Sequence, residues 1–246
     1  MGVNAMQIVQ EAVEAHGGME YWSSLKAIDA VLSARGFLFT AKRRQVLDHV
    51  RMRAATAEPR FTFFDFPRPG QSAELVGDDE VRILDSGGTV IARREKPRLA
   101  FHGIRRQFFW DDLDFVYFGG YATWNYLTAP YLLARKGFLL EALEPVQTPS
   151  GQLVRVQATF PTDIPTHSRK QVFYFDDRRL LRRLDYTAEV VGGWASAAHF
   201  CDDYRAFGRL VVPTRRWVLP LFSRKIPLPG PTLVAIDVHD IRPVEA

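Results

Sequence analysis

The chain has 246 residues, 47% of them hydrophobic, and a formal net charge of +4. This composition is typical of a folded globular protein with a sizeable core and excludes a largely disordered chain. Its single cysteine, Cys201, excludes an internal disulfide framework and a cysteine-rich metal site. No apolar run is as long as a membrane-spanning helix, and the N-terminus has no secretory signal pattern, so we expect a cytoplasmic protein without a membrane span.

The arginines occur mostly in pairs along the chain, such as Arg43–Arg44, Arg93–Arg94 and Arg182–Arg183. Adjacent residues of a strand point to opposite faces, so each pair places one charge on each face. A nucleic-acid-binding surface instead gathers its basic residues on one face or along one helix. We therefore expect no nucleic-acid partner. A module that binds a surface or nucleic acid through its arginines is kept only as a minor alternative to the two functions given below.

The N-terminal region, residues 1–26, predicts two short helices. Asn4 is a typical N-cap for a helix over residues 4–16, and Gly17–Gly18 end that helix. His16 lies in its last turn, where the helix dipole favours an imidazolium ion. A second short helix follows, with Met19, Trp22 and Leu25 at spacings of three.

Residues 27–100 predict β-strands. Long strands are expected at "AIDAVLSARGFLFT" (27–40) and "QVLDHVRMRA" (45–54), and a short aromatic strand at "RFTFFDF" (60–66). The stretch "EVRILDSGGTVIARR" (80–94) is typical of a hairpin with a turn at "DSGG". Residues 138–246 predict a second series of strands, at about 140–147, 152–160, 167–175, 180–190, 197–206, 209–218 and 232–241.

Residues 105–136 between these two series are the most aromatic part of the chain and predict a helical cover. The acidic run "DDLD" (111–114) suits the first turn of a helix, where the dipole favours negative charge. We expect Gly119–Gly120 to divide two helical pieces, with Thr123 beginning the second and Pro130 shortening it.

The architecture follows from this order of elements. Sequential strands with short turns and no helices between them form an antiparallel sheet, and a sheet of ten or so strands curls or closes. We therefore predict one domain over residues 1–246 with a mainly β (α+β) fold. Its large curved antiparallel sheet, or incomplete β-barrel, is covered on the concave face by an N-terminal helix and a central helical pair. Such a shape often encloses an apolar cavity.

The stretch "EAVEAHGGMEYWSSLKAIDAV" (11–31) reads as a helix, two glycines and a short helix that lead into a first strand. Together with the hairpin-rich C-terminal half, it resembles the bacterial lipoprotein-localisation carriers of the LolA-like superfamily. That resemblance implies an incomplete β-barrel with helices over its mouth and an apolar cavity for acyl chains. The carriers are secreted and this chain shows no signal, so the resemblance favours the cavity over transport across a periplasm.

The chain also resembles, more closely, a group of uncharacterised actinobacterial-type proteins. The shared segments are the same N-terminal opening, "WDDLDFVYFGGYATWNYL" (110–127), "THSRKQVFYF" (166–175), "LLRRLDYTAEVVGG" (180–193) and "VVPTRR" (211–216). This resemblance implies no particular activity.

Common catalytic motifs are missing from the sequence. It has no G-x-S-x-G, G-x-G-x-x-G, P-loop, H-E-x-x-H or EF-hand pattern, which argues against the common hydrolases, dinucleotide enzymes and NTPases. None of the six histidines lies four residues from another ligand on a helix. We therefore expect no metal and no other cofactor.

The stretch "THSRKQVFYF" changes from polar to aromatic along both faces of a predicted strand. His167, Arg169 and Gln171 share one face with Phe173 and Phe175, because side chains alternate along a strand. If that face is concave, it describes a pocket with a polar mouth and an aromatic floor. If it is convex, the basic side chains are simply solvated.

Two other strands carry further candidates for acid–base chemistry. Tyr186 belongs to the apolar face of "RRLDYTAEV" and would line a cavity, whereas Asp185 belongs to the solvated face. His199 has alanine and cysteine as neighbours on its own face, so it is either a general base or a hydrogen-bonded structural histidine. The candidate catalytic residues are His167, His199, Tyr186 and Arg169.

Aromatic side chains with polar tips suit a ligand cavity as well as a core. The candidate ligand-binding residues are Trp110, Phe115, Tyr117, Tyr121, Trp124, Tyr126, Gln171, Phe173, Phe175, Tyr186 and Trp217. The leading hypothesis is a protein that binds a hydrophobic small molecule or lipid in an apolar cavity. The alternative is a cofactor-independent enzyme that acts on an apolar small molecule in the same cavity with His and Tyr acid–base groups.

Overall fold

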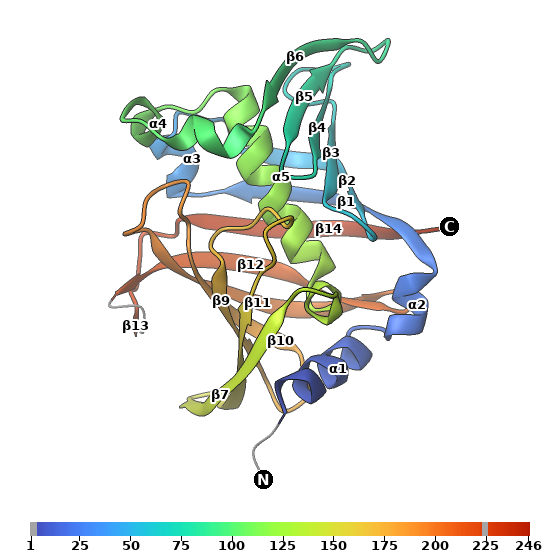
Figure 1. The fold of residues 1–246 in the computed structure, drawn as a ribbon, viewed down its shortest axis with the longest axis vertical. Coiled ribbons are helices and arrows are strands. Elements are labelled where there is room, and N and C mark those ends of the chain that lie inside the picture. The colour runs from blue at the N-terminus through green and yellow to red at the C-terminus, as the bar shows by residue number, and fades with distance from the viewer. Residues whose placement is uncertain (1–3, 223–225) are drawn as a thin grey trace.

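A computed structural model describes residues 4–222 and 226–246. In these residues the strands form one 14-stranded antiparallel sheet, in the order β6-β5-β4-β3-β2-β1-β14-β12-β11-β10-β9-β8-β7, with the short β13 paired to β12. The sheet is strongly curved and does not close into a barrel (Figure 1). The predicted mainly β fold with a large curved antiparallel sheet is therefore confirmed.

The N-terminal half of the chain forms one wing of the sheet. Its strands are β1 (Leu25–Arg35), β2 (Leu47–Ala55), β3 (Arg60–Phe64), β4 (Ser72–Val76), β5 (Glu80–Leu84) and β6 (Val90–Glu95). Buried residues alternate with half-buried or exposed ones along β3, β4 and β5, which shows that one face of this wing is covered. The strand β4 was not predicted, because its sequence "SAELV" lies between turn-rich segments without a long apolar run.

The C-terminal half forms the other wing. Its strands are β7 (Leu139–Thr148), β8 (Gly151–Thr159), β9 (Lys170–Phe175), β10 (Leu181–Thr187), β11 (Ser196–Phe207), β12 (Leu210–Phe222), β13 (Ile226–Pro227) and β14 (Val234–Glu245). The last strand, β14, pairs with β1 and so joins the two wings. Each of the seven strands predicted in this half is present, although β9 begins three residues later than expected.

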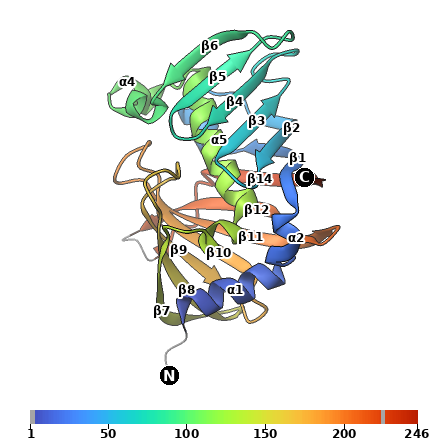
Figure 2. The same cartoon turned by 45° about the vertical axis from the view of Figure 1, so that its right-hand side comes forward.

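The helices lie at the ends and across the concave side of the sheet (Figures 1 and 2). They are α1 (Ala5–Ala15), α2 (Met19–Ser23), α3 (Phe37–Ala41), α4 (Arg105–Phe108) and α5 (Asp112–Thr128), with 3-10 turns η1 (Pro97–Phe101) and η2 (Tyr131–Ala134). Among the described residues, none of these helices combines the length and apolar character that a membrane span requires.

The N-terminal helix begins where it was predicted. The Asn4 side chain accepts a hydrogen bond from the backbone N–H of Met6 at 3.0 Å. The prediction that His16 is an imidazolium ion at the end of this helix is wrong. His16 is 3% exposed, and its burial lowers the pKa to about 4, so the ring is neutral at neutral pH.

The central cover is one long helix, which corrects the predicted pair divided at Gly119–Gly120 and restarted at Thr123. Helix α5 runs without a break from Asp112 to Thr128. A Cβ atom on Gly119 would lie 3.2 Å from the Phe63 ring, and one on Gly120 would lie 3.2 Å from Cβ of Leu75. These glycines therefore allow the helix to approach β3 and β4 closely.

The predicted strand over 27–40 is also corrected, because β1 ends at Arg35 and residues 37–41 form α3. Gly36 has a φ of +137°, and a Cβ atom there would lie 2.6 Å from the backbone oxygen of Leu233. The chain turns out of the sheet at this glycine. The N–H of Phe37 then donates to the oxygen of Thr232 at 3.0 Å, which holds α3 against the segment before β14.

Candidate functional site

An apolar cavity lies between α5 and the middle of the sheet. Its walls come from β1, β2, β3, β14, α3, α5 and β10. Apolar side chains predominate in the lining, including Leu32, Leu47, Phe63, Phe118, Ala122 and Ile236. The cavity encloses about 60 Å³. Because ligand pockets typically measure roughly 300–1,000 Å³, a lipid-sized ligand enters only if lining side chains or helices move outward.

Two basic residues that follow α3 line one end of this cavity, which we call the basic end. Lys42 donates from Nζ to the backbone oxygens of Gln107 at 2.6 Å and Arg106 at 3.2 Å. Arg44 forms an ion pair with Asp112 in the first turn of α5, and its guanidinium lies 5.5 Å from the Phe115 ring. The basic end is therefore tied to both α4 and α5.

Tyr126 and Tyr186 also line the cavity, and we call this part the tyrosine end. Tyr126 lies eleven residues after Phe115 on α5, which corresponds to about 16 Å along a helix. The Tyr126 hydroxyl is 2.7 Å from Nε2 of His167 and 3.2 Å from the Tyr186 hydroxyl. The rings of His167 and Tyr186 stack with centroids 4.0 Å apart.

The other ring nitrogen of His167, Nδ1, lies 3.2 Å from the Tyr121 hydroxyl. The four side chains thus form a continuous relay, Tyr186–Tyr126–His167–Tyr121. A neutral imidazole has one donor and one acceptor nitrogen, so one tyrosine donates to His167 and the other accepts from it. The relay spans α5, the segment before β9, and β10.

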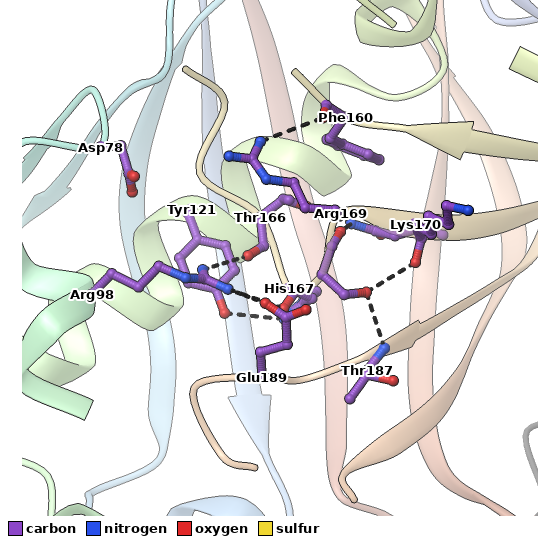
Figure 3. A network of polar contacts seen from close by, with 12 residues as sticks. Asp78, Arg98, Tyr121, Phe160, Thr166, His167, Arg169, Lys170, Thr187 and Glu189 are labelled. Atoms are coloured by element: carbon purple, nitrogen blue, oxygen red, sulfur yellow. Dashed lines mark hydrogen bonds and ion pairs between the residues drawn. The ribbon is translucent and has the colours of Figure 1, made fainter. Parts of the chain in front are cut away.

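Arg98 fixes the backbone that carries His167. Its guanidinium donates to the oxygen of Thr166 at 2.8 Å and to Oε2 of Glu189 at 2.6 Å. Figure 3 shows Arg98 reaching from η1 across to Thr166 and Glu189, beside His167 and Tyr121. The N–H of Glu189 in turn donates to the oxygen of His167 at 3.2 Å. The histidine is thus held from both its side chain and its main chain.

Burial sets the protonation states of the relay. Desolvation, assisted by the nearby Arg98 cation, lowers the pKa of His167 to about 3. Desolvation also raises the pKa values of Tyr126 and Tyr186 well above their ordinary range. At neutral pH the histidine is therefore uncharged and both phenols keep their protons, so a tyrosine hydroxyl can donate a hydrogen bond into the cavity.

A second buried group lies behind Tyr126. The His199 ring makes an edge contact with Tyr126 at 4.3 Å between centroids, and neither of its ring nitrogens has a hydrogen-bond partner in the described residues. Burial lowers the pKa of His199 well below its ordinary value. Arg216 lies next to it and donates to the backbone oxygen of Tyr126 at 2.9 Å and to Sγ of Cys201 at 3.1 Å.

The structure thus brings together three of the four candidate catalytic residues: His167 contacts Tyr186 directly, and His199 contacts it at 6.4 Å between ring centroids. Arg169 is separate. It is exposed and donates to the backbone oxygens of Phe160, Pro161 and Thr162, as Figure 3 shows in part. His167 and Arg169 were predicted to lie on one face of a strand. They do not, because β9 begins only at Lys170 and strand alternation does not extend back to His167.

Four candidate ligand-binding residues line the cavity: Trp110, Phe115, Tyr126 and Tyr186. Tyr121 belongs to the relay. Other candidates have structural contacts: Tyr117 donates to Asp78, Trp124 to the oxygen of Ala55, and Gln171 to the oxygen of Ser168. Phe173 and Phe175 are buried in the core.

Trp217 lies on the other face of the sheet. It alternates with the buried Arg216, which contacts Tyr126, and it stacks on Phe200 at 5.3 Å.

Sequence reasoning missed the basic end. Arg44 was read as one of the arginine pairs spread along the chain, and Lys42 was not singled out. The turn at Gly36 that brings both to the cavity was not predicted. In the described part of the chain, no three His, Cys, Asp or Glu side chains gather in a way that could hold a metal ion.

No protein-family model matches the sequence, and no curated protein matches it significantly. Solved structures do match. A LolA superfamily protein from Nitrosomonas europaea has a TM-score of 0.56 and 12% identity, and the match covers 100% of this chain and 95% of that one. A domain named as an outer membrane lipoprotein-sorting protein, from Vibrio parahaemolyticus, has a TM-score of 0.54 and 10% identity over 97% and 91%.

The fold is LolA-like. A DUF1329 family protein from Desulfovibrio piger agrees with this architecture, at a TM-score of 0.53 and 13% identity over 97% of this chain and 92% of that one. At these identities the matches establish the LolA-like fold and not an activity. They confirm the architecture that the segment over residues 11–31 suggested.

Proposed function

We propose that this protein binds a hydrophobic small molecule or lipid between α5 and the concave face of its LolA-like sheet. The observation that carries the proposal is the apolar cavity along α5. The likeness in fold to a domain named for lipoprotein sorting supports lipid-bearing ligands as candidates. Burial of apolar ligand surface would supply the binding free energy, at about 25 cal/mol per Å².

The enclosed volume requires the cavity to widen when it is filled. The parts best placed to move are α3 and α4, which are short and carry exposed apolar side chains near the basic end. Phe37 is 53% exposed, Ile104 is 82% exposed and Phe108 is 65% exposed. Such side chains suit the entrance of an apolar ligand, because they offer it contacts before it is fully enclosed.

A titration with Nile red, an uncharged apolar dye whose fluorescence rises in apolar surroundings, tests this proposal. We expect saturable binding at one site per chain, and we expect excess hexadecanol to displace the dye. Non-saturable fluorescence that hexadecanol does not displace would show that the cavity takes no apolar ligand.

The relay at the tyrosine end favours a second candidate function, a cofactor-independent enzyme acting on an apolar substrate. In the tautomer in which Nε2–H of His167 donates to Tyr126, the Tyr126 hydroxyl donates to Tyr186, and the Tyr186 hydroxyl can donate a hydrogen bond to a substrate oxygen. Arg169 has no part in this version, because it lies outside the cavity.

Proton exchange tests the enzymatic candidate separately from binding. Long-chain methyl ketones would be incubated with the protein in D₂O and examined by mass spectrometry. Deuterium incorporation that is lost in Tyr186→Phe and His167→Gln would support proton transfer by the relay. Binding of the ketones without incorporation would leave the protein as a binding protein.

A further inference from the structure

Lys42 is a buried cation without a carboxylate partner. Lys42 is 3% exposed, and its ammonium forms no ion pair with an Asp or Glu in the described residues. Two acceptors, the backbone oxygens of Arg106 and Gln107, take two of the three N–H groups of its ammonium. The ammonium also lies 5.3 Å from the centroid of the Trp110 ring, which lines the same cavity. A buried charge is costly unless it is paired.

Arg44 adds unused donor capacity beside Lys42. Its two terminal nitrogens are engaged, one by Asp112 and the other by the oxygen of Trp110 at 3.3 Å. Its Nε is buried and has no hydrogen-bond partner in the described residues. Both basic residues that line the cavity therefore retain N–H groups that a ligand could use.

Nearby carboxylates do not neutralise this end of the cavity, because arginines already occupy them. Asp111 and Asp114 pair with Arg94 and Arg106, while Asp112 pairs with Arg44. Each of these acidic side chains has at least one arginine within 3.2 Å, so none is left for Lys42. Among Lys42, the three arginines and the three aspartates of this group, one positive charge is in excess, beside an apolar cavity.

We propose that the ligand is an anionic amphiphile, whose carboxylate or phosphate head group binds Lys42 and Arg44 and whose apolar tail follows α5 toward Tyr126. This inference rests on the proposed binding function and specifies the ligand class. A carboxylate or phosphate would pair the Lys42 charge and accept from Nε of Arg44. The apolar side chains between Phe115 and Tyr126 would contact the tail over about 16 Å of helix.

A purely structural role for Lys42 is the competing explanation. Its two hydrogen bonds go to carbonyls in α4, where a cation is favoured at a helix C-terminus. In that case removal of the charge would loosen α4 without changing which head group the cavity prefers. The head-group preference is therefore the readout that separates the two roles.

The test compares ligands with identical tails in the full chain: hexadecanoate, hexadecyl phosphate, hexadecanol and hexadecyltrimethylammonium. Each would displace Nile red at pH 8, below its critical micelle concentration. We expect the two anions to bind at least about tenfold more tightly than the alcohol, since a hydrogen bond to a charged group contributes roughly that factor, and the cation to bind most weakly. Preference for one anion over the other would identify the head group.

The variants Lys42→Gln and Arg44→Gln should bring the affinity for hexadecanoate close to that of the same variant for hexadecanol, so that the preference of the wild type for the anion is lost. If a variant does not fold, the series of four ligands on the wild-type protein still tests the head-group preference. Equal binding of the anions, the alcohol and the cation would overturn the head-group inference and leave the proposed function standing. Failure of all four to bind would overturn the proposed function itself.

Discussion

The hydroxyl of Tyr126 lies 2.7 Å from Nε2 of His167, although the two residues are 41 positions apart in the chain. This contact links the C-terminal part of α5 to the segment before β9. Two protonated tyrosines at the wall of an apolar cavity, and the neutral histidine that contacts them, are polar groups that satisfy one another without charge. The arrangement lets hydrogen-bonding groups border an apolar ligand at low cost in desolvation.

Tyr126→Phe should destabilise the protein. The substitution leaves Nε2 of His167 without its partner, and an unsatisfied buried polar group costs about 1–3 kcal/mol. Urea unfolding at pH 7.5 would measure the change in the free energy of unfolding. Tyr21→Phe, at a half-buried ring that lies over Arg209, is the control and should change stability by no more than about 0.5 kcal/mol. Equal stability of both variants would show that the Tyr126–His167 hydrogen bond contributes nothing.

Stability should fall as the pH is lowered from about 6.5 toward 4. The pKa values of His16 and His167 fall from 6.5 to about 4 and about 3 in the folded protein, because both rings are buried. Between those values and 6.5 the unfolded chain binds protons that the folded chain does not. Each such histidine therefore adds a slope approaching about 1.4 kcal/mol per pH unit to the free energy of unfolding.

Urea unfolding between pH 7.5 and 4.5 measures this slope. His167→Gln should reduce the slope of the free energy of unfolding against pH by up to about 1.4 kcal/mol per pH unit, whatever its effect on stability at pH 7.5. His102→Gln, at an exposed position, should leave the slope unchanged. A free energy of unfolding that stays flat down to pH 5 would contradict the burial of neutral histidines.

Thr123→Trp should block the cavity. Thr123 lines it from α5 and is half-buried, so a large side chain there can enter the cavity without displacing core residues. We expect binding of Nile red or hexadecanol to weaken by at least about tenfold, which corresponds to about 1.4 kcal/mol. Thr123→Ala, at the same position, should bind as well as wild type. Full binding by the Trp variant would place the ligand elsewhere.

Asp114→Asn should be strongly destabilising. The carboxylate is fully buried, accepts from Arg94 at 2.6 Å and from the N–H of Asp111 at 3.1 Å, and lies 2.8 Å from Arg106. Loss of one member of a buried ion pair typically costs about 3–5 kcal/mol. Asp112→Asn removes a more exposed partner and should cost no more than about 1 kcal/mol. Thermal unfolding of the two variants side by side would reveal the difference, and equal melting temperatures would refute it.

The sheet could be predicted from sequence because hairpin turns and alternating strands are local patterns. Helix α5 was only partly predictable: Gly119–Gly120 looks like a break locally, and only the closeness of Phe63 and Leu75 explains why glycines belong in a continuous helix. Arg169 was grouped with His167 because alternation was assumed to begin before the strand did.

The candidate site, too, was predictable only where it depends on local patterns. His167 stood out at the polar start of a predicted strand, and Tyr186 and Tyr126 stood out as polar-tipped side chains in apolar surroundings. Their hydrogen bonds, however, depend on contacts between distant segments. Lys42 could not be recognised as a binding residue, since its burial depends on the turn at Gly36 and on the approach of α4. Local patterns therefore predicted the framework, and tertiary contacts determined the basic end.

Native mass spectrometry of the full chain, purified without detergent and followed by solvent extraction, tests the central claim most directly. We expect a fraction of the protein to carry one apolar adduct, and we expect added hexadecanoate to give a complex with one ligand per chain that Thr123→Trp does not form. A chain that carries no adduct, and that forms no such complex with hexadecanoate or hexadecanol, would contradict the claim that this LolA-like protein binds apolar ligands along α5.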